Sequence, residues 1–207
     1  MNGIVIELHY LPSVSYFTLI QGSDTLFVEK FEHYEKQSYR NRCYIKTAGG
    51  VETLIVPLTG KHGKTLIKDV RIDYSQKWLN NHWRTIQSAY GNAPFFEFYC
   101  DDLHQILFKK HEFLFDLNSD LLIMILKRLK CNIPIQETTI YKKEYPATIK
   151  DCRSLLNPKK EDSCNRFFKS VEYHQVFGSK FVQNLSIIDL IFCEGPGALK
   201  IVQASVA

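Results

Sequence analysis

The sequence predicts an α/β or α+β fold with an N-terminal strand–helix–strand unit, a β-hairpin, a helical middle and a short C-terminal α/β portion. Three observations predict it: apolar runs on either side of an aromatic segment near the start, a double glycine between two alternating segments, and apolar residues at helical spacing in the middle. At 207 residues the chain is long enough for one sizeable core. We expect a single domain over 1–207, with an N-terminal α/β part at about 1–92, a helical part at about 93–131 and a C-terminal part at about 132–207.

The first unit places polar residues at the end of a strand. GIVIEL (3–8) predicts a short buried strand, Pro12 and the residues after it predict the first turn of a helix, and TLFVEK (25–30) predicts a second, parallel strand. His9 and Tyr10 then lie at the carboxyl end of the first strand. In open α/β sheets that edge is where ligands commonly bind.

The hairpin is predicted to begin with a strongly basic strand. RNRCYIK (40–46) and VETLIVPL (51–58) flank a glycine turn, and alternation places Arg40, Arg42 and Lys46 on one face. Such a face suits a phosphate or carboxylate, because the guanidinium fork binds these groups in a fixed geometry. The alternative is a solvated rim of an antiparallel sheet, which composition alone favours.

A further strand is predicted at TLIKDVRID (65–73), after the basic turn GKHGK (60–64). The glycines of that turn suit a phosphate-binding loop, but their spacing matches no P-loop. A flexible basic turn is therefore the favoured interpretation.

The middle of the chain is predicted to be helical. Ser75 is expected to cap a helix that Gly91 ends, and the buried stripe of this helix contains both tryptophans, with His82 at its edge. A histidine there is more often hydrogen-bonded to the core than catalytic, although its pKa near neutrality suits a general base. Two further helices are expected at 93–109 and 117–131, followed by a strand at 133–143. A loop is expected at 157–169 and a short apolar helix at 185–197.

Composition and charge exclude several classes of protein. A net charge of +4 and a pI near 8.6 are too modest for a protein whose main partner is nucleic acid. No apolar stretch approaches the ~18 residues of a membrane span, and the first residues do not form a signal peptide. The six cysteines are widely spread without a C-x-x-C pair or a metal-binding spacing, which favours free thiols in a cytoplasmic protein. The sequence leaves the cofactor unknown.

The common nucleotide-binding, hydrolase and zinc-protease motifs are absent, which argues against an ordinary dehydrogenase, kinase or esterase. What remains is a set of polar residues that would form a transfer site if the fold brings them together. The candidate catalytic residues are Glu7, His9 and His82. The candidate substrate-binding residues are Tyr10, Arg40, Asn41, Arg42, Lys46 and Tyr90.

Four segments carry a more specific signal: ELHYLPSVSYFTLI, SYRNRCYIKTAGGVETLIVPL, KDVRIDYSQKWLNNHWRTIQSAYGNAPFF and LSIIDLIFCEGPGA. Together they resemble the WbqC-like protein family over most of the chain. The resemblance implies a role with bacterial O-antigen and other surface polysaccharides. Its motif positions in this sequence are Tyr10, Pro12, Arg40, Asn41, Arg42, Lys46, His82, Trp83, Tyr90, Glu194 and Pro196.

The leading hypothesis is a cytoplasmic enzyme that acts on an activated, nucleotide-linked sugar and transfers a group to a sugar amine or hydroxyl. Arg40 and Arg42 would hold the phosphate or carboxylate of this anionic sugar derivative, and His9 or His82 would take the proton from the acceptor. The rival is a non-catalytic binding or scaffold protein of the same pathway. A third reading, single-stranded nucleic acid stacked on the tyrosines between residues 34 and 44, is disfavoured by the modest charge.

Overall fold

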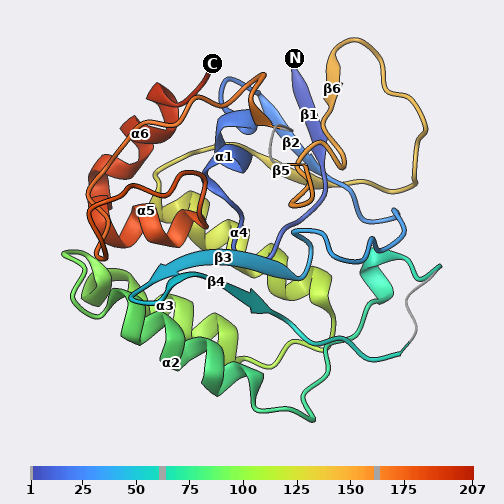
Figure 1. The fold of residues 1–207 in the computed structure, drawn as a ribbon. Helices are drawn as coiled ribbons and strands as arrows, with labels where there is room; N and C mark the ends of the chain where they lie inside the picture. The colour runs from blue at the N-terminus through green and yellow to red at the C-terminus, as the bar shows by residue number, and fades with distance from the viewer. Residues whose placement is uncertain (1, 61–63, 161–163) are drawn as a thin grey trace.

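The computed structural model describes residues 2–60, 64–160 and 164–207, and it confirms the mixed α/β fold. A four-stranded parallel sheet, an antiparallel hairpin and the helices share one hydrophobic core (Figure 1). The strands are β1 (Gly3–Ile6), β2 (Thr25–Val28), β3 (Arg42–Thr47), β4 (Gly50–Ile55), β5 (Ile135–Glu137) and β6 (Ile149–Asp151). The helices are α1 (Val14–Ile20), α2 (Trp78–Tyr90), α3 (Phe96–Phe108), α4 (Leu114–Arg128), α5 (Ile187–Glu194) and α6 (Ala198–Ala204), with 3₁₀ turns η1 (Ile67–Asp69) and η3 (Gly195–Gly197).

The predicted strand–helix–strand unit forms the centre of the parallel sheet. Its strand order is β5-β2-β1-β6, and β1 pairs in parallel with β2 on one side and with β6 on the other. All four residues of β1 and all seven residues of α1 are buried, as expected for a parallel sheet with a helix packed on it. From β1 the chain adds β2 and β5 on one side of the sheet, whereas β6 is added on the other side of β1. The strand order therefore reverses between β1 and β6.

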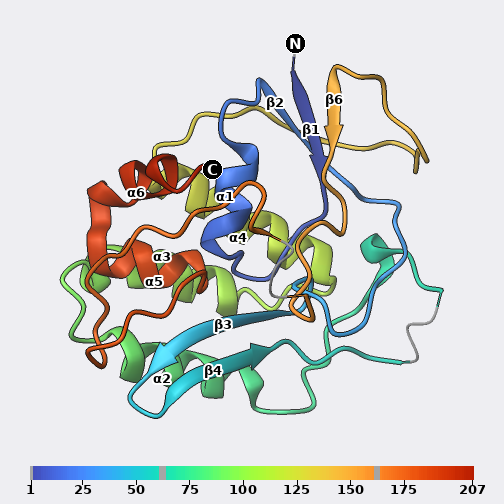
Figure 2. The same ribbon diagram turned by 45° about the horizontal axis from the view of Figure 1, so that its top comes forward.

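The β-hairpin is also as predicted. β3 and β4 pair in an antiparallel register from Arg42 opposite Ile55 to Thr47 opposite Gly50, and Gly50 supplies the positive φ of the turn. In Figures 1 and 2 the hairpin lies beyond the carboxyl ends of the parallel strands, between α2 and the segment that leads into α5. Within β3, Cys43, Ile45 and Lys46 are buried, and the other three residues are half-buried.

Arg40 does not lie on the basic strand face that the sequence predicts. It precedes β3 in a turn and is 1% exposed, and Lys46 on β3 is also buried. The expectation of a shared cationic face was wrong for Arg40, because the turn directs its side chain towards carboxylates at the end of the parallel sheet.

The strand predicted at 65–73 was wrong as well. This segment contains the 3₁₀ turn η1 and makes only isolated bridges, with Leu66, Arg71 and Ile72 each pairing with a different part of the chain. Because its partners are spread over three segments, no continuous ladder forms. The middle of the preceding 60–64 turn, residues 61–63, lies outside the described residues.

The helices largely follow the apolar periodicity. α2, α3 and α4 form where helices were predicted, but the N-cap of α2 is Lys77 and not Ser75, which donates its backbone N–H to Asp73. The strand expected at 133–143 is reduced to β5, and β6 and α6 form where the sequence carries no clear signal. The described parts of 157–169 contain no α-helix or β-strand.

One cluster of buried side chains runs from Ile4 in β1 to Val202 in α6. This shared core supports the single-domain organisation, which stays a prediction. Within the described ranges, no helix is both long and apolar enough to cross a membrane.

Candidate functional site

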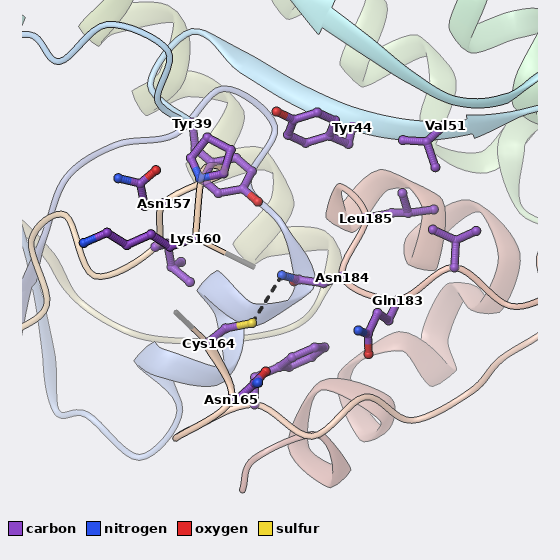
Figure 3. A pocket seen from close by; sticks show the side chains of 14 residues that line it. Tyr39, Tyr44, Val51, Asn157, Lys160, Cys164, Asn165, Gln183, Asn184 and Leu185 are labelled. Atoms are coloured by element: carbon purple, nitrogen blue, oxygen red, sulfur yellow. Dashed lines mark hydrogen bonds between the residues drawn. The ribbon is translucent and has the colours of Figure 1, made fainter. Parts of the chain in front are cut away.

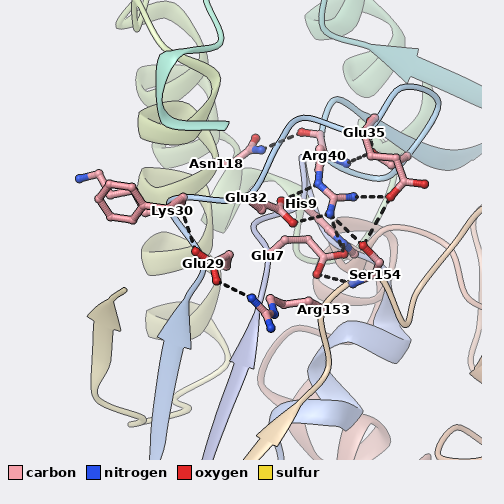
Figure 4. A network of polar contacts seen from close by, with 12 residues as sticks. Glu7, His9, Glu29, Lys30, Glu32, Glu35, Arg40, Asn118, Arg153 and Ser154 are labelled. Carbon is pink, nitrogen blue, oxygen red and sulfur yellow. Dashed lines mark hydrogen bonds and ion pairs between the residues drawn. The ribbon is translucent and has the colours of Figure 1, made fainter. Parts of the chain in front are cut away.

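The carboxyl ends of the parallel strands carry a cluster of charged side chains (Figure 4). Glu7 follows β1 directly, and Ser154 follows β6. The backbone N–H of Ser154 donates to Oε2 of Glu7 at 2.8 Å, so that this contact joins the two strands between which the order reverses. Ligands of open α/β sheets commonly bind at this reversal point, outside the carboxyl ends of the strands.

Glu7 and His9 form a buried pair. Nε2 of His9 lies 3.1 Å from Oε1 of Glu7, and both side chains are 1% exposed or less. The imidazole lies between the rings of Tyr16 and Tyr39, with centroids 4.9 and 5.3 Å away. No described residue hydrogen-bonds the other ring nitrogen, Nδ1. A buried nitrogen without a protein partner costs free energy unless a water, an ion or a bound group satisfies it.

The surroundings set the charges of this pair. Burial opposes ionisation of Glu7, but the hydrogen bond from His9 and the charge of Arg40 outweigh it and lower the pKa of Glu7 to about 2. Burial lowers the pKa of His9, against the opposing effect of Glu7. At neutral pH we therefore assign a carboxylate and a neutral imidazole that donates its Nε2 proton to Glu7 and keeps a lone pair on Nδ1.

Arg40 is held on all sides by protein acceptors. Its Nε and one terminal nitrogen donate to the two oxygens of Glu32 at 2.6 and 2.7 Å, and further contacts reach Ser154 Oγ at 3.1 Å and Glu35 at 3.5 Å. Glu7 lies 3.8 Å away. Burial opposes the charge of Arg40, but these carboxylates keep its pKa above the ordinary arginine value. Because protein acceptors occupy its guanidinium, Arg40 is better placed to position the Glu7 carboxylate than to bind a ligand.

A second ion-pair network continues along the same sheet edge. Arg153 contacts Asp151 at 2.6 Å and the fully buried Glu29 at 2.9 Å. Glu29 also accepts a hydrogen bond from Thr138, which follows β5. All four parallel strands thus contribute a polar side chain at or just after their carboxyl ends.

A pocket of about 360 Å³ lies one side chain away from the Glu7–His9 pair, and neither Glu7 nor His9 is among the residues that line it (Figure 3). Tyr39 connects the two, because its ring stacks on His9 and also lines the pocket. Tyr44 from β3 stands next to Tyr39, while Cys164 and Asn184 lie across from them. The remaining lining comes mainly from the segments after β6 and before α5.

The other predicted site residues lie in separate contacts. The Tyr10 hydroxyl and Nδ1 of His82 are 2.9 Å apart, and burial lowers the pKa of His82 to about 4. Asn41 donates to the main chain of Val56 at 2.9 Å. Arg42 is half-buried on β3, and its Nε has no hydrogen-bond partner among the described residues.

Lys46 and Tyr90 belong to a third buried network. Tyr90 donates to Asp189 at 2.9 Å, and Gln175 joins Asp189 to Lys46 through contacts of 3.1 Å each. Burial raises the pKa of Asp189, against the opposing effect of its hydrogen-bond donors, including Tyr173. The structure thus brings Glu7, His9 and Arg40 together. Tyr10 and His82 contact each other at a second place, and Lys46 and Tyr90 belong to a third.

Several residues of the cluster lack a specific signal in the sequence. Glu29 and Glu32 follow β2, so the reasoning that singled out the end of β1 would have found them if applied to the second strand. Ser154 follows a strand that was not predicted, and its contact with Glu7 spans 147 positions in sequence. Tyr39 was considered only as part of a nucleic-acid platform.

No group of histidine, cysteine, aspartate and glutamate side chains in the described ranges is arranged to hold a metal ion. None of the six cysteines, all of which lie in the described ranges, forms a disulfide, and burial raises the pKa of those for which a shift is resolved, such as Cys43 and Cys152. Neither of these two is therefore activated as a thiolate.

Comparison with known proteins gives one family. The model of the WbqC-like protein family matches residues 8–157 and 161–201. An uncharacterized protein of Mycobacterium tuberculosis, Rv1507c, is 34% identical over 122 residues, which are 57% of this chain and 52% of the relative. The chain thus spans about half the length of this curated relative. No solved structure matches the chain significantly.

Proposed function

We propose, because this chain belongs to the WbqC-like protein family, that it is a cytoplasmic enzyme of bacterial surface polysaccharide (O-antigen) biosynthesis that acts on an activated, nucleotide-linked sugar. The family resemblance supports the pathway, and the geometry at the end of the parallel sheet supports the chemistry. The observation that carries the proposal is the fully buried His9, whose Nδ1 lacks a partner while its Nε2 is fixed by Glu7 beside a pocket.

In this proposal His9 is the general base of a group transfer. The lone pair of Nδ1 takes the proton from a sugar hydroxyl or amine as that oxygen or nitrogen bonds to the transferred group, and the bond between this group and its leaving group breaks. Glu7 stabilises the resulting imidazolium and holds the tautomer in which Nδ1 is unprotonated. Tyr39 stacks on His9 and also lines the pocket, so a single side chain links the base to the pocket.

The other candidate residues take supporting roles. Arg40 and Ser154 hold Glu7 in place, since both contact its carboxylate. Arg42 remains a candidate for the anionic part of the substrate, because its Nε is unpartnered among the described residues. We assign the pairs Tyr10–His82 and Lys46–Tyr90 to the support of the hairpin and α2, and Asn41 to the turn before β3.

The test is turnover of nucleotide sugars by the purified protein, with and without acyl-coenzyme A, followed by mass spectrometry of the products. We expect conversion of at least one nucleotide sugar. His9→Asn should lower kcat by about 10²–10⁴-fold, the usual contribution of a general base, with little change in KM. The same substitution at the exposed His33 is the matched control and should leave kcat unchanged.

The alternative, a non-catalytic scaffold protein of the same pathway, predicts no conversion of nucleotide sugars. It is favoured by two exposed apolar side chains on neighbouring helices, Phe98 on α3 and Ile123 on α4, which are 71% and 51% exposed. If no nucleotide sugar is converted or bound and the protein forms a stable complex with an enzyme of the same pathway, the enzyme proposal is wrong.

A further inference from the structure

We infer that the pocket lined by Tyr39 and Tyr44 receives the sugar ring of the substrate and leaves the nucleotide outside. The inference rests on the proposed function, since it identifies which part of a nucleotide sugar the pocket recognises. Four properties of the pocket carry it: its aromatic side, its amide side, its fixed wall and its size.

The aromatic side consists of two tyrosines at different angles. The rings of Tyr39 and Tyr44 meet edge to face, with centroids 5.9 Å apart and an angle of 83° between their planes. Both side chains are half-buried, so part of each remains available to a ligand. An apolar aromatic body with a polar hydroxyl tip suits a pyranose, which presents C–H groups on its faces and hydroxyls at its rim.

The opposite side is rich in amides. Asn157, Asn165, Gln183 and Asn184 line the pocket together with Lys160. A side-chain amide offers both donors and an acceptor, which matches sugar hydroxyls that donate and accept at once. Asn184 is held in place, because its Oδ1 accepts from the Ser15 backbone N–H at 3.0 Å and its Nδ2 contacts the Cys164 sulfur at 3.7 Å.

The part of the wall that carries Gln183 and Asn184 is fixed in advance. Gln175 bonds both the N–H and the C=O of Val182, at 2.9 and 2.8 Å. Further along, the C=O of Leu185 accepts from Val14 at 3.0 Å, and the N–H of Ser186 donates to Tyr44 at 2.8 Å. These contacts join the wall to α1 and β3, as is usual for small-molecule sites, which are largely preformed.

The volume of the pocket indicates which part of a nucleotide sugar it can hold. Ligand pockets commonly measure about 300–1,000 Å³, and this pocket, at about 360 Å³, lies at the small end of that range. A nucleotide sugar contains a base, a ribose, a diphosphate and a sugar ring, which together need far more space than one ring. The pocket therefore accommodates one sugar ring, and the cationic Lys160 lies at its exposed rim.

The experiment is calorimetric titration with UDP-, GDP- and dTDP-linked hexoses, followed by titration of the best ligand's two halves, the sugar 1-phosphate and the nucleoside diphosphate. We expect the sugar 1-phosphate to retain binding and the nucleoside diphosphate to show none. Tyr44→Leu should weaken binding about tenfold, the effect of one lost aromatic contact. Tyr44→Phe, which keeps the ring and loses only the hydroxyl, should bind more tightly than Tyr44→Leu, and Phe98→Leu on the exposed face of α3 is the control for the substitution.

The outcomes separate this inference from the proposed function. Binding of the nucleoside diphosphate without the sugar 1-phosphate would overturn the inference while leaving an enzyme of nucleotide sugars intact. Equal binding by wild type and a Tyr44→Leu variant of unchanged far-UV circular dichroism would also overturn it. Absence of binding by every nucleotide sugar would overturn both.

Discussion

At the scale of single residues, the Glu7–His9 pair is the feature that most distinguishes the site. A carboxylate orients the imidazole from one side, while the opposite nitrogen has no partner among the described residues. The same Glu7 receives the Ser154 N–H and lies next to Arg40. The carboxylate thus serves two donors, and a change to it affects both the tautomer of His9 and the contact between β1 and β6.

Glu7→Gln tests this double role. An amide in the same place turns its NH₂ group towards either the Ser154 N–H or the Nε2–H of His9, so one buried donor loses its acceptor. We expect a loss of about 1–3 kcal/mol in the free energy of unfolding, measured by urea denaturation. Glu35→Gln is the matched control: its carboxylate is 48% exposed and 3.5 Å from Arg40, so the loss should stay below about 1 kcal/mol. Equal losses in the two variants would contradict the assignment.

His82 gives a prediction for pH dependence. Burial lowers its pKa from 6.5 to about 4, so the folded protein keeps it neutral while the unfolded chain binds a proton below pH 6.5. Its contribution to stability is therefore complete above pH 6.5 and is lost as the pH falls towards 4, by about 3 kcal/mol. His82→Gln should show a smaller decrease in the free energy of unfolding over this interval. An identical decrease in wild type and variant would show that His82 does not titrate in this way.

Part of the site could be predicted at this scale. His9 follows the predicted strand 3–8, which predicts its position at the sheet edge that binds ligands; Glu7 lies at the same edge because β1 ends at Ile6. Arg40 could not be placed, because alternating charges in a strand-like segment resemble a solvated face, and its main partner, Glu32, has no spacing that marks an ion pair. Likewise, the pairing of Tyr10 with His82 spans 72 positions and depends on how α2 packs against the hairpin.

At the scale of elements, the segment between Tyr173 and Ser186 functions as one wall of the pocket without regular secondary structure. It is held by side chains in place of a backbone ladder: Gln175 bonds Val182, and both Gln175 and Tyr173 bond Asp189 at the start of α5. The buried Lys46 on β3 completes the network by donating to Gln175 and to the main chain of Lys180. The position of the wall therefore depends on Gln175.

Gln175→Ala should release this wall. Because the Oε1 of Gln175 accepts from the Val182 N–H, we expect the amide of Val182 to exchange with solvent about tenfold faster or more in the variant. The Val14 amide, which bonds Leu185, should be affected less. Gln203→Ala on the exposed side of α6 is the control. Unchanged exchange at Val182 in Gln175→Ala would mean that other contacts hold the wall.

The elements also show where sequence patterns carry information. α2, α3 and α4 are long and have clear apolar stripes, and all three form where their periodicity predicts them. β6 has only three residues, two of them exposed, so it has no apolar run that would mark it, yet it provides one side of the site. The segment at 65–73 has strand-like composition, but three separate partners divide it.

At the scale of the whole molecule, the hairpin, α5 and the parallel sheet meet at a single place, and the candidate site lies there. The pocket takes residues from β3, from the segment after β6 and from the segment before α5, all of which also contribute to the common core. Such a site forms only when the N-terminal and C-terminal parts of the chain fold together.

A single cooperative unfolding transition follows from this arrangement. We expect calorimetric and van't Hoff enthalpies of unfolding to agree in differential scanning calorimetry, as for one domain. Two separated transitions, or a van't Hoff enthalpy well below the calorimetric one, would show that the C-terminal part is a separate lobe.

The measurement that tests the central claim most directly is thermal unfolding of the protein against a panel of nucleotide sugars, free nucleotides, acyl-coenzyme A and short oligonucleotides. A ligand at about 100 times its dissociation constant adds about 2.7 kcal/mol to the free energy of unfolding, which raises the midpoint by several degrees in a domain of this size. We predict such a rise with at least one nucleotide sugar, and its reduction in Tyr44→Leu. No rise with any nucleotide sugar, or a rise that Tyr44→Leu leaves unchanged, would contradict the claim that this pocket binds an activated sugar.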